Sequence, residues 1–132
     1  ITKTNMKRSI FLIITAVLSL LIGIMCLLSP DKMADGFGVA VTPLIIMLIR
    51  EAGVSNLCMG FLNFAVRNHS DSMSLKAVLF FNMAYHALIL PINIYGWSQG
   101  ILSVDQVGPA FGIHLLLAIG FLLYALKIKT SA

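Results

Sequence analysis

The chain has 132 residues, of which 59% are hydrophobic and only 11% are charged. An average soluble domain carries about 25% charged residues, so this composition excludes a disordered chain and argues against an ordinary soluble enzyme of this size. The lipid bilayer is the solvent that suits such a chain. Because one transmembrane helix takes about 20 residues, four helices with short loops use nearly the whole length and leave no room for a separate soluble domain.

Four apolar segments are each long enough to cross a hydrocarbon core about 30 Å thick. In chain order, the predicted spans are about residues 9–28, 43–66, 75–97 and 107–126. Thr42 is the expected N-cap of the second span, with Pro43 in its first turn, and Asp105 is the expected N-cap of the fourth. Because the segments are continuously apolar rather than alternating, they predict an all-α fold instead of a β-barrel.

The connections between the spans are short, which makes neighbouring helices antiparallel. We therefore expect one domain, residues 1–132, folded as an up-down-up-down transmembrane four-helix bundle. Seven basic residues fall on one side of such a bundle: Lys3, Lys7, Arg8, Arg67, Lys76, Lys127 and Lys129. Since Lys and Arg concentrate on the cytoplasmic side, both termini are expected there. The net charge of +4 follows this rule, and the bases form no stripe with aromatic residues of the kind that binds nucleic acid.

The first span has a second interpretation, because Met6, Lys7 and Arg8 before an apolar run also resemble the start of a secretory signal peptide. The run is longer than the usual apolar region of about 7–15 residues, and no small-residue cleavage site follows it. These features favour a retained helix over a cleaved signal. Met6 is a candidate native start, in which case Ile1 to Asn5 are an added segment.

Several polar and ionisable residues lie inside the predicted spans, where such groups are costly and suggest a function by default. At a rise of 1.5 Å per residue, Arg50, Glu51 and His114 lie about 12–14 Å beneath the outer surface, and His86 lies about 16 Å beneath it. Asn93 lies nearer to that surface. An antiparallel bundle would bring all five residues into the outer half of its interior.

The spacing of polar residues in the third span predicts that they point inward. One face of this helix carries Asn82, Tyr85, His86, Ile89 and Asn93, while its other faces are apolar. Pro91 lies beside this stripe and is expected to free the carbonyl of Ala87 from its helical partner and to kink the helix there. A kink next to His86 would open space for a ligand or water.

The second span carries a comparable stripe of small and polar residues. Its members are Gly53, Asn56, Gly60, Asn63 and Arg67. Arg50 borders this stripe, whereas Glu51 points to the other side of the helix. The two charged residues are adjacent and diverge by about 100°, so each is expected to pair with a histidine of another helix rather than with its neighbour.

These polar groups have two interpretations. The first, which we favour, is an outward-facing pocket whose candidate ligand-binding residues are Arg50, Glu51, Asn56, Asn82, His86, Asn93 and His114. The second is a charge network that only fixes the register of the helices. Small residues at helical spacing, such as Thr15, Ser19 and Gly23, serve packing within the bundle or a homo-oligomer contact.

The pocket interpretation predicts an accessory or ligand-binding membrane protein for a quinone, a lipid or another amphiphile, without catalytic residues. One alternative is a small membrane enzyme in which Glu51 and a histidine transfer protons. Another is a b-type haem protein that uses His86 and His114 as axial ligands. Proton or ion transport is a further alternative, because Glu and His relays occur in transporters, but no inverted repeat with broken helices is visible. No metal or cofactor is assigned, since the remaining histidine, His69, lies in a loop. The expected partners are membrane lipid, the ligand, and a homo-oligomer or larger membrane complex.

Short motifs occur along the chain in a recognisable order. They are Leu28-Ser29-Pro30 at the end of the first span, Ile49-Arg50-Glu51-Ala52-Gly53 and then Gly60 in the second, Asn82 with His86 in the third, and a fourth span followed by bases. Over most of its length the chain thereby resembles the DoxX-like group of small four-helix bacterial membrane proteins. The resemblance implies a four-helix bundle in a bacterial inner membrane. Some members of the group are similar to subunits of quinone-linked redox systems, and the group implies no catalytic set here. The chain lacks the cysteine pair at a membrane face that a thiol-redox role would need.

Overall fold

The computed structural model describes residues 3–129, which form five α-helices and no strand. The helices are α1 (Lys3–Leu28), α2 (Pro30–Gly36), α3 (Pro43–Val66), α4 (Met73–Ser98) and α5 (Val104–Leu126). The all-α prediction is therefore confirmed. The structure does not describe the side chains of residues 1–5. The predictions about this segment, including the one for the basic side chain of Lys3, therefore lie outside the described part of the chain.

Four of the helices, α1, α3, α4 and α5, are long and apolar enough to cross a membrane. The part of α1 that meets this description is Met6–Leu28, and the other three helices meet it over their full lengths. The chain is accordingly a small multi-pass integral membrane protein. The helical backbone satisfies its own hydrogen bonds, which is what a segment in hydrocarbon requires.

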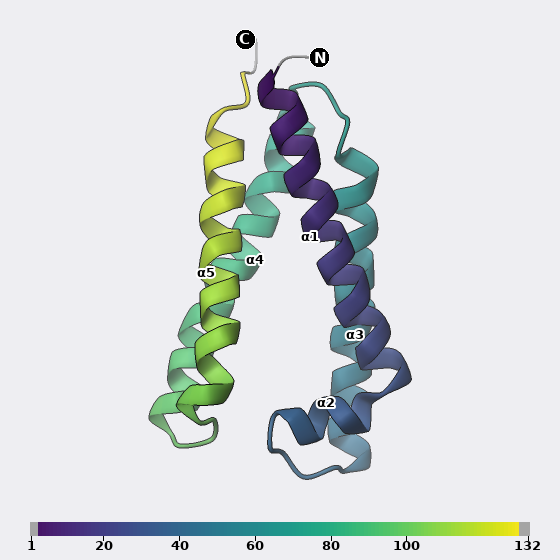
Figure 1. Ribbon diagram of the computed structural model, residues 1–132, viewed down its shortest axis with the longest axis vertical. Helices are drawn as coiled ribbons and strands as arrows, with labels where there is room; N and C mark the ends of the chain where they lie inside the picture. Colours follow the sequence, from purple (N-terminus) through teal and green to yellow (C-terminus); the bar gives the residue numbers. More distant parts are fainter. Residues whose placement is uncertain (1–2, 130–132) are drawn as a thin grey trace. The chain divides into compact units, whose positions relative to one another are not determined.

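The chain divides into two compact units between Asn68 and His69. We call them the first hairpin, which contains α1, α2 and α3, and the second hairpin, which contains α4 and α5. Within each hairpin the two long helices lie side by side (Figure 1). The residue pairs in contact run in opposite directions along the two helices, so each hairpin is antiparallel, as the short connections predict.

Glycines set the close approach of α1 and α3 in the first hairpin. A Cβ atom added at Gly53 would lie 2.8 Å from Cys26 Cβ and 3.0 Å from the carbonyl oxygen of Gly23. A Cβ added at Gly60 would lie 2.7 Å from Leu20 Cγ. The backbones meet where no side chain stands between them, which is how small residues join helices in lipid.

Hydroxyl side chains cap the N-terminal ends of α3, α4 and α5. Thr42 Oγ1 accepts a hydrogen bond of 3.2 Å from the backbone N–H of Ile45, which confirms Thr42 as the N-cap of α3. The prediction for the last helix was wrong, because Ser103 and not Asp105 is its N-cap. Ser103 Oγ accepts from the N–H of Gln106, and the Gln106 side chain accepts from the N–H of Ser103 at 2.7 Å. This capping box fixes the start of α5 at Val104, and Asp105 lies within the first turn.

The helix boundaries agree with the predicted spans to within a few residues, apart from the longer N-terminal end of α1. The second span is reproduced as Pro43–Val66. Helix α4 extends beyond its predicted span at both ends, and α5 begins earlier than predicted but ends where predicted. The short helix α2 was not predicted. It begins with Pro30, whose missing N–H costs nothing at a first helical position. Pro91 lies within α4, which continues without interruption to Ser98, and the kink beside it stays a prediction.

Glycines in the left-handed conformation end α2 and α4. Gly38 has a φ of 66° and Gly100 a φ of 67°. In the second hairpin, the N–H of Ile101 donates to the carbonyl of Gly96 and the N–H of Gly100 donates to that of Trp97. This is a Schellman motif, in which a residue without Cβ adopts the positive φ. It reverses the chain within a few residues and thereby brings α5 back along α4.

A candidate functional site at a buried histidine pair

Two histidines, one from each helix of the second hairpin, meet near the middle of their helices. His86 of α4 and His114 of α5 face each other through their Nδ1 atoms, which are 2.8 Å apart. His86 lies about 18–20 Å from either end of α4, and His114 about 15–18 Å from either end of α5, at 1.5 Å per residue. A hydrogen bond between the two rings places them at one level, although the predicted depths differed by about 4 Å. The earlier start of α5 contributes to this alignment.

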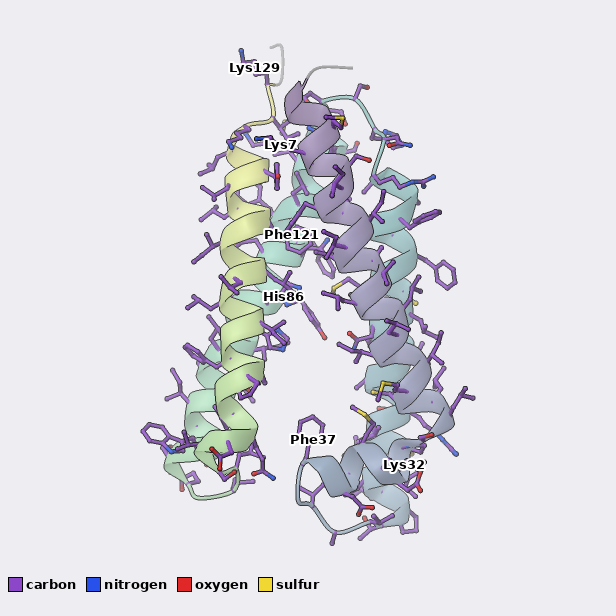
Figure 2. The ribbon with its side chains drawn as sticks, viewed as in Figure 1. Lys7, Lys32, Phe37, His86, Phe121 and Lys129 are labelled. Carbon is purple, nitrogen blue, oxygen red and sulfur yellow. The ribbon has the colours of Figure 1, made fainter. Side chains whose placement is uncertain are left out.

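Aromatic rings enclose the pair. The ring of Phe121 stacks on that of His86 with centroids 5.8 Å apart and planes 13° from parallel, as their neighbouring positions in Figure 2 illustrate. Tyr85 meets His86 edge to face at 5.3 Å. His86 is only 6% exposed, and His114 is half-buried. These contacts hold the His86 ring in a largely apolar setting, where a polar group needs a partner.

The hydrogen bond dictates the protonation pattern of the pair. A bond between two Nδ1 atoms needs a proton on one of them and a lone pair on the other. When both rings are neutral, the donor ring therefore has a lone pair at Nε2, and the acceptor ring has its proton at Nε2. In this neutral state the pair offers its surroundings one hydrogen-bond donor and one acceptor.

The other predicted polar residues of α4 differ in their surroundings. Asn82, four residues before His86, is fully buried, and its Nδ2 donates to the carbonyl of Val78 at 2.9 Å. Asn93 is half-buried, and its Nδ2 atom is inaccessible to solvent and has no hydrogen-bond partner among residues 3–129. An amide N–H group without a partner in an apolar region is costly, and it marks Asn93 as a second place where a ligand group or water would be stabilised.

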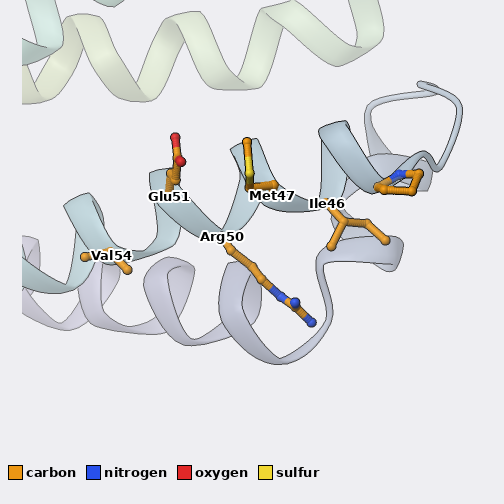
Figure 3. A pocket seen from close by; sticks show the side chains of 6 residues that line it. Ile46, Met47, Arg50, Glu51 and Val54 are labelled. Carbon is orange, nitrogen blue, oxygen red and sulfur yellow. The ribbon is translucent and has the colours of Figure 1, made fainter.

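The predicted site residues of α3 lie in the first hairpin. Arg50 and Glu51 line an open depression of about 550 Å³ together with Pro43, Ile46, Met47 and Val54. Figure 3 shows the two charged side chains leaving α3 in different directions, in line with their predicted divergence. Both are exposed, and neither side chain makes a hydrogen bond or ion pair with the described residues of this hairpin. Arg50 lies about 10 Å along the helix from Pro43.

The structure thus brings together two of the seven predicted site residues directly. His86 bonds His114, while Asn82 and Asn93 belong to the same hairpin. Asn56, of the first hairpin, is half-buried and donates its Nδ2 hydrogen bond to the carbonyl of its own helix at Ala52, at 2.9 Å. The predicted convergence of Arg50 and Glu51 with the histidines stays a prediction, because these residues belong to separate units.

The geometry of the pair bears on the haem alternative. Metal–imidazole bonds are about 2 Å long, so two axial nitrogens on one iron lie about 4 Å apart. The Nδ1 atoms lie 2.8 Å apart and bond each other directly, which leaves no place for an iron between them. Within residues 3–129, no group of three or more His, Cys, Asp or Glu side chains is arranged to hold a metal ion.

Two features of the buried polar groups were not predicted. Arg8, assigned to the solvated cytoplasmic end, is only 3% exposed, and Asn63 of α3 is 1% exposed. The stacking of Phe121 on His86 was also missed. The signal for it was present in the sequence, because His114, Ala118 and Phe121 follow the i, i+4, i+7 spacing of one helical face. Ala118 and Phe121 are indeed buried.

Comparisons of this chain with protein-family models, with curated proteins and with solved structures found no match. The assignment to the DoxX-like group accordingly stays a prediction.

Proposed function

We propose that this small integral membrane protein binds an uncharged amphiphile, such as a quinone or a lipid with a carbonyl or hydroxyl group, at the His86–His114 pair. The observation that carries the proposal is the hydrogen bond of 2.8 Å between the two Nδ1 atoms near the middle of both helices. Polar side chains are expensive at membrane depth and mark functional sites there by default.

The chemistry of the pair favours an uncharged ligand. Its two Nε2 atoms provide one donor and one acceptor, which suit a carbonyl or a hydroxyl group. The headgroup of a phospholipid lies outside the hydrocarbon core, which is about 30 Å thick, whereas the pair is near the middle of both helices. The ligand is therefore expected to be a molecule dissolved in the core with a polar group on an apolar body. Asn93, with its unpaired amide group, is a further contact in this proposal.

The depression at Arg50 provides a second element of the proposal. An exposed guanidinium inside a span attracts an anionic or carbonyl group, and Arg50 has no partner within its own hairpin. Glu51 would balance its charge. In this arrangement Arg50 binds a second amphiphile, about 10 Å along α3 from its first residue, Pro43.

The proposed orientation places both termini in the cytoplasm of a bacterial cell, with the chain in the inner membrane. The ends of both hairpins that carry the chain termini are basic. Arg67 lies over the ring of Phe64 at 3.7 Å, and Lys127 Nζ lies 5.7 Å from the ring centroid of Tyr124. Base-and-aromatic pairs of this kind suit the cytoplasmic membrane interface. Membership in the DoxX-like group and assembly into a homo-oligomer or larger complex belong to the same proposal.

The test is to identify the small molecules that copurify with the protein. Wild-type protein, the His86→Phe/His114→Phe double variant and the Arg50→Leu variant are extracted in mild detergent, and bound molecules are quantified by mass spectrometry. We expect at least tenfold less of an uncharged amphiphile to copurify with the double variant than with the wild type. The variant His69→Gln, in the loop before α4, is the matched control and should retain the same amount of this amphiphile as the wild type.

Circular dichroism and size-exclusion chromatography establish that each variant is folded. Added decyl-substituted benzoquinone supplies an independent binding measurement. If all variants retain the same molecules in the same ratios and bind the quinone equally, the binding proposal fails. The polar residues would then act as a structural network.

A further inference from the structure

The hydrogen bond between His86 and His114 joins two groups that can each take up and release a proton. We propose that the pair is a one-proton relay, which passes protons between the α4 side and the α5 side of the second hairpin. This activity goes beyond ligand binding. It depends on the direct contact of the two Nδ1 atoms at 2.8 Å and not on the presence of an amphiphile.

The transfer balances in three steps. At the start, one ring carries the shared proton on Nδ1 and has a free lone pair at Nε2, while the other ring carries its proton on Nε2. A protonated water or hydroxyl donor delivers a proton to the free Nε2 of the first ring, which becomes an imidazolium. The shared proton then moves from Nδ1 of the first ring to Nδ1 of the second, and the second ring releases its Nε2 proton to a water or hydroxyl acceptor. One proton enters, one leaves, and no electrons are exchanged.

The relay has a built-in alternation. After one passage each ring has the tautomer that the other had before, so the second ring now offers the free Nε2. The next proton can therefore pass only in the opposite direction, unless the rings first reset. The pair is thus suited to exchanging a proton back and forth between two partners, for example a hydroxyl compound and water, rather than to steady one-way flow.

The surroundings of the pair favour transfer within it. The other ionisable groups on α4 and α5 are Lys76, Tyr85, Tyr95, Asp105 and Tyr124. Of these, Tyr85 makes a ring contact with His86. The stacked ring of Phe121 and the edge contact of Tyr85 cover His86. In such an apolar setting a hydrogen bond between two nitrogens is electrostatically stronger than in water.

Nitrogen-15 nuclear magnetic resonance of histidine-labelled protein in lipid bilayers tests the relay. The His69→Gln background leaves only the two histidines of the pair. We expect a scalar coupling across the hydrogen bond between the two Nδ1 nuclei, and exchange of both residues between two tautomers at one common rate. Separate rates for the two residues, or fixed tautomers without exchange, would overturn the proposal.

The variant His114→Asn provides the matched comparison, because its amide can still hydrogen-bond to His86 but cannot pass a proton on. We expect the tautomer exchange of His86 to slow at least tenfold in it, and His86→Asn should do the same to His114. Unchanged exchange would contradict the relay. The wild-type measurement needs no substitution and decides the question even where a variant fails to fold. Binding of decyl-substituted benzoquinone to the same samples reports on the binding proposal separately, so either can fail alone.

Discussion

Gly53 of α3 packs directly against the Cys26 side chain of α1, and a Cβ atom added at Gly53 would lie 2.8 Å from Cys26 Cβ. The same atom would lie 3.0 Å from the carbonyl oxygen of Gly23, which belongs to the backbone and cannot rotate away. A substitution here must push the two helices apart. The contact therefore defines how closely the first hairpin closes.

We expect Gly53→Ala to destabilise the first hairpin by about 1–3 kcal/mol, as overpacking of a closed contact does. The measurement is the unfolding free energy in mixed micelles, followed by circular dichroism during titration with a denaturing detergent. Gly108→Ala is the control, because a Cβ there meets no atom of its own hairpin within 4 Å and alanine favours the helix by about 1 kcal/mol. Equal stability of the two variants would contradict the close approach.

The capping box of α5 leads to a second prediction. Ser103→Ala removes the hydroxyl that accepts from the N–H of Gln106 and should cost about 1 kcal/mol. Asp105→Ala removes only a favourable charge from the first turn and should cost less. Amide hydrogen exchange at Gln106 distinguishes them, since it should accelerate in the serine variant alone. Faster exchange in the aspartate variant instead would reinstate Asp105 as the cap.

A third prediction concerns the turn between α4 and α5. Gly100 has a φ of 67°, and a Cβ there meets nothing within 4 Å in its hairpin, so Gly100→Ala tests conformation alone. We expect a loss of about 1–2 kcal/mol, the cost of the left-handed conformation for a residue with a Cβ. Gly36→Ala in α2 also enters open space, but without a positive φ. It should leave the thermal midpoint unchanged or raise it, and a similar loss in both variants would contradict the prediction.

The histidine pair predicts energetic coupling between two residues far apart in the sequence. His86→Phe alone leaves His114 without its partner and should cost about 1–3 kcal/mol, the penalty for a buried polar group that loses its hydrogen bond. The double variant His86→Phe/His114→Phe should recover part of this loss. A double-mutant cycle on unfolding free energies should give a coupling of about 0.5–3 kcal/mol. Additive losses would show that the bond contributes no stability.

Much of the fold was predictable because hydrocarbon solvent imposes strong rules on sequence. Continuous apolar segments gave four helices, and Thr42 with Pro43 marked the start of α3 correctly. The errors concern where helices begin, which local features of the sequence determine. Ser103 outcompetes Asp105 because Gln106 stands three residues after it and completes the capping box. The helix α2 was overlooked although Pro30 at its first position and Asp31 in its first turn are typical of a helix start.

The site was predictable in its residues but not in its contacts. Helical spacing selected Asn82 and His86, and the structure buries both. Depth estimates brought His114 near His86, but no sequence pattern states that the two Nδ1 atoms bond each other. That contact depends on the rotation of α5 about its own axis, which the capping box and the packing of Ala118 and Phe121 set together.

The division of the chain at Asn68 and His69 has a consequence for its biosynthesis. Each half contains two membrane-crossing helices that close on one another, α1 with α3 and α4 with α5. Every residue of the first helical pair precedes every residue of the second, so α1 and α3 leave the ribosome ahead of α4 and α5. The glycine-lined seam of the first pair therefore needs no segment encoded after residue 68 in order to close.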